Sequence, residues 1–279
     1  MLQRRKQALP APAQNQHHSE AIVPHISFSE LKNWNFCPFY HKLVHIDKVS
    51  AFKGNEYTAF GTAIHDVCER QVIKEDQSAT EHFLERFEEE LKQLDSDVEI
   101  RNDLVESMRQ QGATLAPEAV PMLSEVFGEY EVVSAEERLY EPIEGSDDYT
   151  FKGFIDLVIK TSDGKYHIID WKTCSWGWDA RRRADPMTTY QLTLYKHFWA
   201  KKHNIDEKMV ETHFALLKRT AKKDRVEIFR VTSGTRKTTN ALNLLDKALH
   251  NIQKGSCIKN RLSCTSGYGC ELYKTKHCP

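Results

Sequence analysis

Residues 153–173 read GFIDLVIKTSDGKYHIIDWKT. Two runs of β-branched and aromatic residues flank the turn signal SDG at 162–164, so the pattern predicts two strands joined by a hairpin. Asp156 lies inside the first strand, and Asp170 and Lys172 lie at the end of the second. A carboxylate within an apolar strand is costly unless something compensates it. These three residues therefore mark a candidate site.

The length of the hairpin loop decides whether the two carboxylates can meet. Side chains alternate along a strand, so Asp170 and Lys172 share one face of the sheet. A two-residue loop would place Asp156 on the opposite face from Asp170. A loop of odd length at 162–164, or a β-bulge, places them side by side. We therefore predict an odd loop or a bulge, with both carboxylates close enough to bind one cation.

Two interpretations of this hairpin remain open on its residues alone. Two carboxylates beside a lysine can hold Mg²⁺ through oxygen ligands and still offer a positive donor to a phosphate or a water molecule. An ordinary half-buried strand also carries solvated acids and lysines on its polar face. The surrounding sequence has to distinguish the two.

The rest of the chain predicts an α/β fold. We expect a disordered tail over residues 1–24, because it lacks an apolar period. Residues 25–279 are predicted to be one domain, with a mainly helical part (25–128), a catalytic α/β core (129–255) and a Cys-rich tail (256–279). The helices are expected near 27–45, 59–74, 78–94, 98–111, 117–127, 186–202 and 235–253. The strands are expected near 131–141, 149–160, 166–171, 209–217 and 225–231.

Composition limits the function classes. The chain has 39 basic and 40 acidic residues, so a nucleic-acid partner would have to bind a local basic patch. No stretch reaches the roughly 18 apolar residues that a membrane span needs. A signal-peptide core is also absent, which predicts an intracellular, cytoplasmic protein without a membrane partner, or one in the host cytoplasm if a phage encodes it. The basic cluster at 4–6 leaves organelle targeting by the tail open.

Four separated segments resemble the PD-(D/E)XK nuclease superfamily, and more narrowly its RecB-like branch, which includes CRISPR-adaptation nucleases and phage exonucleases. They follow one another in the expected order. They are ISFSELKNWNFCPFYHKL (26–43), FGTAIHDVCE (60–69), GFID (153–156) with DWKT (170–173), and TYQLTLY (189–195). The resemblance implies a restriction-endonuclease-like mixed sheet flanked by helices, with a helical N-terminal region.

The resemblance also implies roles for individual residues. One or two Mg²⁺ or Mn²⁺ ions would be bound by His65, Asp156, Asp170 and the main-chain carbonyl of Trp171. Lys172 would orient the attacking water or stabilise charge on the phosphate. Gln191 and Tyr195, one helical turn apart, would steady the site or the DNA.

Four of the seven cysteines lie in the last 23 residues. In iron–sulfur members of the RecB-like branch, one N-terminal cysteine joins three C-terminal ones around a 4Fe–4S cluster, which here implies Cys37, Cys264, Cys270 and Cys278. The spacings in this tail are longer than the usual ones. Zinc is the chemical rival, and Cys257 could replace one ligand.

A loop rich in aromatic residues and arginines follows Lys172 directly. Such a loop suits base stacking and phosphate contact on single-stranded DNA, although solvated loops have similar compositions. The candidate DNA contacts are Trp176, Trp178, Arg181, Arg182 and Arg183.

Taken together, the sequence predicts a metal-dependent DNA exonuclease that hydrolyses phosphodiester bonds from ends or on single strands, in recombination, repair or phage DNA processing. The expected partners are DNA and a helicase or recombination protein. Two rivals stay open: an inactive nuclease-like module that binds DNA in a recombination complex, and an endonuclease of the same fold. The complete set of His65, Asp156, Asp170 and Lys172 favours the enzyme.

Overall fold

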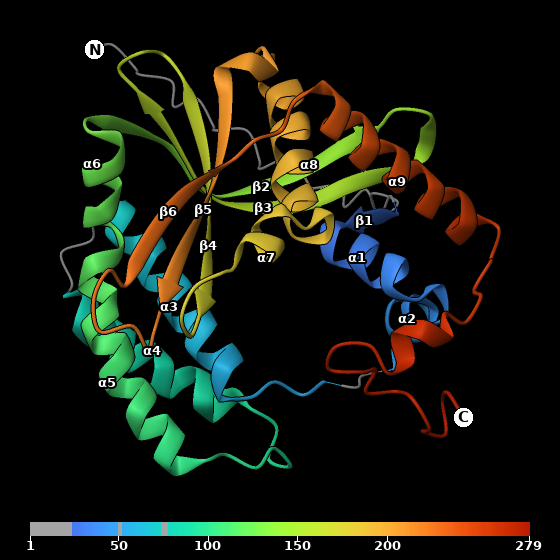
Figure 1. Cartoon of the computed structure of the whole chain (residues 1–279), viewed down its shortest axis with the longest axis horizontal. Helices are drawn as coiled ribbons and strands as arrows, with labels where there is room; N and C mark the ends of the chain where they lie inside the picture. The colour runs from blue at the N-terminus through green and yellow to red at the C-terminus, as the bar shows by residue number, and fades with distance from the viewer. Residues whose placement is uncertain (1–23, 50–51, 74–77) are drawn as a thin grey trace, which may run out of the picture.

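The computed structural model describes residues 24–49, 52–73 and 78–279. The disorder predicted for residues 1–24 falls on residues 1–23, which lie outside this part. The described chain is built around one mixed sheet with helices on both faces (Figure 1). None of its helices is both long and apolar enough to cross a membrane.

The first half of the described chain is mostly helical, as predicted. Its elements are β1 (His25–Ser27), α1 (Phe28–Phe36), α2 (Pro38–His41), a π-helical turn (Lys42–Ile46), α3 (Glu56–Val72), α4 (Ala79–Gln93), α5 (Asn102–Ala119) and α6 (Pro121–Phe127). The second half alternates strands and helices. It contains β2 (Tyr130–Ile143), β3 (Ser146–Thr161), β4 (Tyr166–Cys174), α7 (Ala180–Ala184), α8 (Pro186–His203), β5 (Val210–Lys218), β6 (Val226–Val231) and α9 (Thr235–Gln253).

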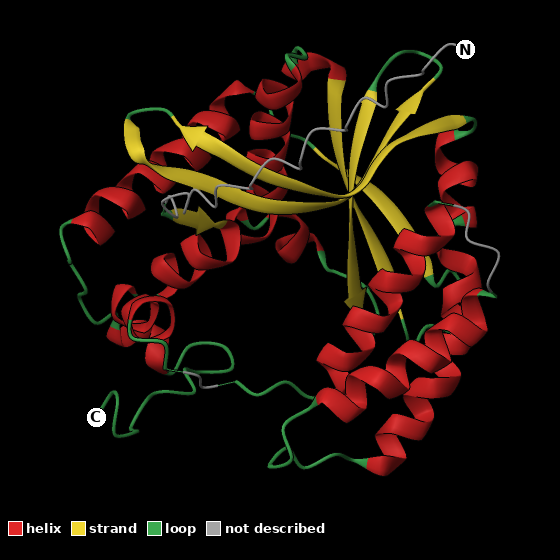
Figure 2. Ribbon diagram, turned by 180° about the vertical axis from the view of Figure 1, so that it is seen from behind, coloured by secondary structure: helices red, strands yellow, loops and turns green. Residues whose placement is uncertain are grey.

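The sheet follows the order β1-β3-β4-β5-β6, with β2 paired to β3. β1 runs parallel to β3 and β4 runs parallel to β5, whereas the other pairs are antiparallel. Figure 2 shows from behind how the long β2–β3 pair leaves the rest of the sheet. This is the mixed sheet that the resemblance implied.

Each face of the sheet carries its own hydrophobic core. Ile168 and Ile169 are neighbours in β4, yet Ile168 packs into the core under α1, α8 and α9, whereas Ile169 packs into the core under α3, α4 and α5. Alternation along a strand covered on both faces produces such continuous apolar runs. The fully apolar stretches in the sequence are therefore explained by helices on both faces.

The helix predicted from about Ser27 to His45 is interrupted at Cys37, which corrects that prediction. Ser27 caps α1 as expected, accepting a hydrogen bond from the Glu30 N–H at 3.2 Å. Cys37 is extended, with φ −162° and ψ 115°, because a residue before proline is sterically disfavoured in the helical region. Pro38 then starts α2. The break turns the Cys37 thiol toward the chain end.

The Cys-rich tail returns to this break. The Asn260 side-chain amide donates to the Phe36 carbonyl at 2.9 Å, and the Asn260 main-chain N–H lies 3.3 Å from the Cys37 sulfur. The Tyr40 hydroxyl donates to Glu271 at 2.6 Å. The tail is thus fastened to the first helices by polar contacts across more than 220 residues of sequence.

Candidate active site

The loop that joins β3 to β4 has the predicted odd length. The Thr161 N–H donates to the Lys165 carbonyl at 3.0 Å, which closes the loop around residues 162–164. Gly164 ends it with φ +84°, a conformation that glycine adopts without strain.

The register set by this loop brings the two acidic residues together. Leu157 pairs with Ile169, so the next position along the hairpin sets Asp156 against Asp170. The ladder between β3 and β4 ends at this pair, and the strands then separate toward different neighbours. The prediction of an odd loop is confirmed, and the register that it sets places Asp156 opposite Asp170.

β3 bends at Asp156. Ile155 packs into the core under α8, but Leu157, two residues on, packs into the opposite core, so side-chain alternation changes phase between them. Opposite this point in β2, Glu136 has a positive φ of 48°. The bend lets Asp156 Oδ2 accept the Trp171 N–H at 2.8 Å, which satisfies a main-chain donor of β4.

Asp170 and Lys172 form an ion pair in which Asp170 is buried and Lys172 is partly exposed. Burial raises the pKa values of Asp170 and Asp156 to about 6 each, and the Lys172 ammonium pulls both down. Burial also disfavours the ammonium, but the two carboxylates outweigh it and raise the pKa of Lys172. Lys172 is therefore held in its charged form.

His65 approaches the same point from α3. Its Nδ1 lies 3.5 Å from Asp156 Oδ2, and the ring is within hydrogen-bonding reach of the Trp171 main chain. Burial, helped by the nearby Lys172 charge, lowers the pKa of His65 to about 4. The imidazole is thus neutral at neutral pH, the form in which histidine binds metals.

Gln191 and Tyr195 reach the site from α8. The Gln191 amide donates to the Tyr195 hydroxyl oxygen at 3.3 Å, and Tyr195 lies close enough to Lys172 and Asp170 for electrostatic interaction. The Tyr195 ring packs over Gly153, where a Cβ would lie 2.7 Å from Tyr195 Cε1. A side chain at position 153 would therefore displace Tyr195 from the site.

The sequence analysis missed Glu136. Its carboxyl lines a hollow of about 400 Å³ together with His65 and Glu69. Burial, with the charges of Asp156, Glu69 and Asp170, raises the pKa of Glu136 to about 7. The sequence signal was ambiguous, because Glu136 and Glu137 are adjacent in a strand and the pattern does not say which one faces the site.

The arrangement can hold a divalent cation. Glu136 interacts electrostatically with Glu69, Asp156 and Asp170, and Lys172 acts as a cation on both aspartates, so acidic groups are in excess. Carboxylate oxygens, a main-chain carbonyl and one imidazole are donors that Mg²⁺ and Mn²⁺ accept. The chemistry of this donor set therefore fits the ion that the sequence predicted.

A family model of the PD-(D/E)XK nuclease superfamily matches residues 25–274 of the chain. The chain belongs to the PD-(D/E)XK nuclease superfamily. Membership and site geometry together support a nuclease function, and the family and fold predicted from sequence are confirmed.

The nuclease is also similar in fold to solved structures. A protein from Eubacterium rectale assigned as an exonuclease has a TM-score of 0.57 at 13% identity, covering 96% of this chain and 92% of that chain. LHK-Exo in complex with dAMP has a TM-score of 0.30 at 12% identity, covering 72% of this chain and 94% of that chain. The first likeness concerns the fold alone, and the second is too distant to carry an argument. None of the curated proteins compared with the nuclease matches it.

The loop after β4 places the predicted DNA-contact residues of the nuclease in different environments. Trp176 is 75% exposed, whereas Trp178 is 6% exposed and packs against Phe214 and Phe229. Arg182 lies over the Trp178 ring at 4.3 Å, and Arg183 is paired with Glu227 at 2.6 Å. Arg181 is exposed. In this conformation Trp178 cannot stack on a base, and Trp176 with Arg181 and Arg182 remains accessible.

The four cysteines singled out in the nuclease sequence line one small pocket. Cys37 comes from the break after α1, and the chain end supplies Cys264, Cys270 and Cys278. Cys257 does not line this pocket. The structure thus brings together residues that are up to 241 positions apart in the sequence.

Proposed function

We propose that this chain is a metal-dependent DNA exonuclease of the RecB-like branch, acting on ends or single strands in recombination, repair or phage DNA processing. The observation that carries the proposal is the meeting of Asp156 and Asp170, with Lys172, where β3 and β4 separate beside His65. A buried acid, a second, largely buried acid and a partly exposed lysine at one point of a sheet are costly to maintain for structure alone, which favours a functional role.

The metal would be held by His65, Asp156, Asp170 and the Trp171 carbonyl. Bound there, Mg²⁺ or Mn²⁺ would lower the pKa of a water molecule and neutralise charge on the phosphate. Lys172, kept protonated by its two carboxylate neighbours, would donate a hydrogen bond to the attacking water or to a phosphate oxygen. Gln191 and Tyr195 would keep Lys172 and Asp170 in place from the α8 side.

Hollows on both sides of the centre support action at DNA ends. One, of about 400 Å³, contains His65, and another, of about 760 Å³, contains Gly153 and Tyr195. A single strand passing between them would cross the carboxylates, with Trp176 and Arg181 available to stack on a base and bind a phosphate. We propose that the strand enters this path by a free end.

Closed circular single-stranded DNA should therefore survive incubation with Mn²⁺, while a linear strand of the same sequence is degraded. The measurement is gel electrophoresis of both forms over one time course. Equal rates on circle and line would point to an endonuclease, and binding without degradation of either form would point to an inactive module. Trp176→Ala should slow degradation of the linear strand, and Trp178→Ala should lower thermal stability instead.

We further infer that Cys37, Cys264, Cys270 and Cys278 hold a 4Fe–4S cluster. Their common pocket supports this, since thiolates suit such clusters and four are needed. A single zinc ion with Zn–S bonds of about 2.3 Å would bring the sulfurs to about 3.8 Å from one another. No three of these thiols, all in the described part of the chain, have sulfurs within 4.8 Å of one another, which is wider than one zinc ion requires.

Anaerobically purified protein should be brown, with a broad absorption band near about 400 nm that Cys264→Ser removes. Cys257→Ser is the matched control and should keep the colour, because Cys257 lies outside the pocket. Colourless protein with one equivalent of zinc that Cys264→Ser releases would overturn the assignment.

A further inference from the structure

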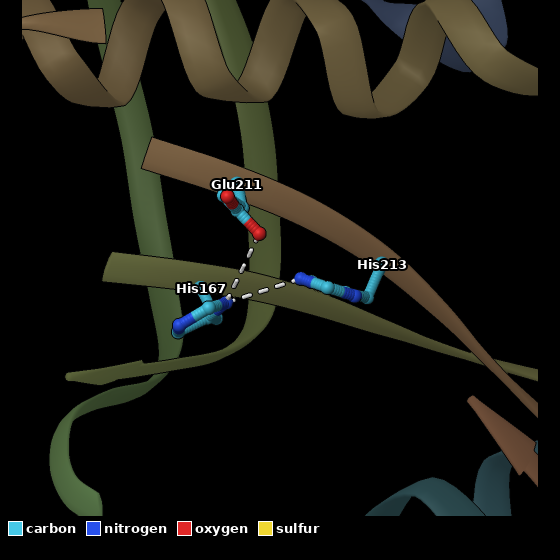
Figure 3. A group of neighbouring side chains, drawn as sticks. All are labelled: His167, Glu211 and His213. Carbon is cyan, nitrogen blue, oxygen red and sulfur yellow. Dashed lines mark hydrogen bonds and ion pairs between the residues drawn. The ribbon is translucent and has the colours of Figure 1, made fainter. Parts of the chain in front are cut away.

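A second group of metal-type side chains lies on β4 and β5, away from the nuclease centre. His167 pairs with Glu211, and His213 lies two positions further along β5, opposite Ile169. All three side chains face the core on the α3–α6 side of the sheet, and Figure 3 shows them converging. Asp170, by contrast, faces α8. His167 and Asp170 thus lie on opposite faces of β4, and the second group shares no residue with the nuclease centre.

The donor atoms of this group are close to a metal-binding arrangement. His167 Nδ1 lies 3.1 Å from His213 Nε2 and 4.0 Å from Glu211 Oε2, and all three ligand atoms lie within 4.8 Å of one another. Tetrahedral zinc with bonds of about 2.0–2.1 Å separates its donors by about 3.3 Å. The two imidazole nitrogens, 3.1 Å apart, already have nearly that spacing, and Glu211 Oε2, at 4.0 Å, would have to move only slightly closer to them.

Neighbouring groups orient the first imidazole. Thr161 has one hydroxyl proton and donates it to Asp163 Oδ1 at 2.5 Å, so toward His167 Nε2, at 3.0 Å, the hydroxyl oxygen acts as acceptor. This arrangement favours the His167 tautomer with its proton on Nε2, which directs the lone pair of Nδ1 toward His213. Metal-binding histidines are commonly held in this way through their other ring nitrogen.

The carboxylate is oriented as well. Glu211 Oε1 accepts from Lys165 at 3.1 Å and is paired with Arg230 at 3.1 Å, which leaves Oε2 directed at the imidazoles. Lys165 and Arg230 keep Glu211 ionised, and both contact its Oε1. Oε2 is thus available as the third metal donor.

Burial separates this group from ordinary surface residues. His167 and His213 are 7% and 6% exposed, and the Phe127 ring of α6 packs against both at 4.8 and 5.0 Å. Burial also lowers the pKa of His213 to about 3, so its ring is neutral and able to bind a metal. Two imidazoles and one carboxylate in a closed setting are ligands typical of zinc rather than of Mg²⁺.

We propose that His167, Glu211 and His213 form a Zn²⁺ site that is separate from the nuclease centre and fastens β4 to β5. Three protein donors leave one position for a water molecule. The proposal does not depend on nuclease activity, because none of its residues belongs to the catalytic set.

The test is zinc stoichiometry of the full chain, stripped with chelator, dialysed against limiting ZnCl₂ and analysed by plasma mass spectrometry. Wild-type protein should bind one equivalent more than His213→Asn or His167→Gln. The extra equivalent should raise the melting temperature of the wild type by several degrees and leave both variants unchanged. His250→Asn, at an exposed histidine at the end of α9, is the matched control and should keep the equivalent.

Two further variants separate this site from the others. Cys264→Ser and His65→Ala should both keep the equivalent, because they alter only the cysteine pocket and the nuclease centre. Glu211→Gln keeps the shape of the side chain and should weaken zinc binding if either histidine variant fails to fold. Equal zinc content in wild type, His213→Asn and Glu211→Gln would overturn the proposal and leave the imidazoles as a hydrogen-bonded pair.

Discussion

Lys172→Ala is expected to abolish DNA cleavage while leaving DNA binding nearly unchanged. Lys172 is the cation between Asp156 and Asp170, and its removal takes away the donor that would act on the phosphate or the water. Loss of one such electrostatic group typically reduces turnover by about 10²–10³-fold. Asp170→Asn should have an effect of the same order, because it removes a metal ligand without changing the shape of the side chain. Cleavage of end-labelled DNA and a filter-binding assay measure the two properties separately.

Lys201→Ala is the matched control for Lys172→Ala. Lys201 is 45% exposed near the end of α8, where it pairs with Glu144, far from the carboxylates. Its loss should leave cleavage unchanged. Circular dichroism establishes that each variant is folded. Full activity of folded Lys172→Ala would contradict a nuclease centre at Asp156, Asp170 and Lys172.

Asp156→Asn is expected to abolish cleavage and, at the same time, to stabilise the metal-free protein. Burial raises the pKa of Asp156 from 3.8 to about 6, so its charge at neutral pH opposes folding. The amide of the variant would keep an oxygen to accept the Trp171 N–H but carry no charge. The melting temperature at pH 7 without metal should rise by roughly 3–8 °C, since about two pKa units correspond to about 3 kcal/mol.

The stability of the metal-free protein should depend on pH in a definite direction. A carboxyl with a raised folded-state pKa binds more protons in the folded than in the unfolded state between the two values, 3.8 and about 6. The stability of the metal-free wild type should therefore fall as the pH rises through this window and remain lower above it. Asp156→Asn should show a smaller fall. Mg²⁺ or Mn²⁺ should raise the melting temperature of the wild type at pH 7 but not that of the variant. A less stable variant at pH 7 without metal would contradict this reasoning.

The sequence predicted the hairpin and the elements around it because local rules decide them. Alternation fixes which side chains share a face, so the loop at 162–164 had to be odd for Asp156 to meet Asp170. The predicted helix over 235–253 matches α9, which begins at Thr235 and ends at Gln253, because its apolar period is unbroken.

Tertiary packing decides the features that the sequence did not predict. Glu136 faces the centre because Glu137 turns to the other side, where it accepts from the Trp199 indole at 2.9 Å and from Lys202 at 2.7 Å. Trp178 and Trp176 look equivalent in sequence, but only Trp178 finds an apolar surface, against Phe214. The sequence period does not indicate which glutamate faces the centre or which tryptophan is buried, because both depend on contacts with residues distant in the chain.

The zinc-type group escaped the sequence analysis for the same reason. His167 and His213 are separated by 46 positions, and they meet only because β4 and β5 are parallel neighbours in one register. Parallel pairing joins segments across a helical crossover, so residue spacing carries no signal of it. The cysteine group, by contrast, was visible because three of its members are clustered at the chain end.

Cleavage of an end-labelled single strand by the purified full chain, with Mn²⁺ and then with excess EDTA, tests the central claim most directly. The assay compares wild-type protein with Lys172→Ala at equal concentration. We predict degradation by the wild type with Mn²⁺, none in EDTA, recovery when Mn²⁺ is restored, and none by Lys172→Ala in any condition. Undiminished degradation in EDTA, or equal degradation by Lys172→Ala, would contradict a metal-dependent centre built on Asp156, Asp170 and Lys172.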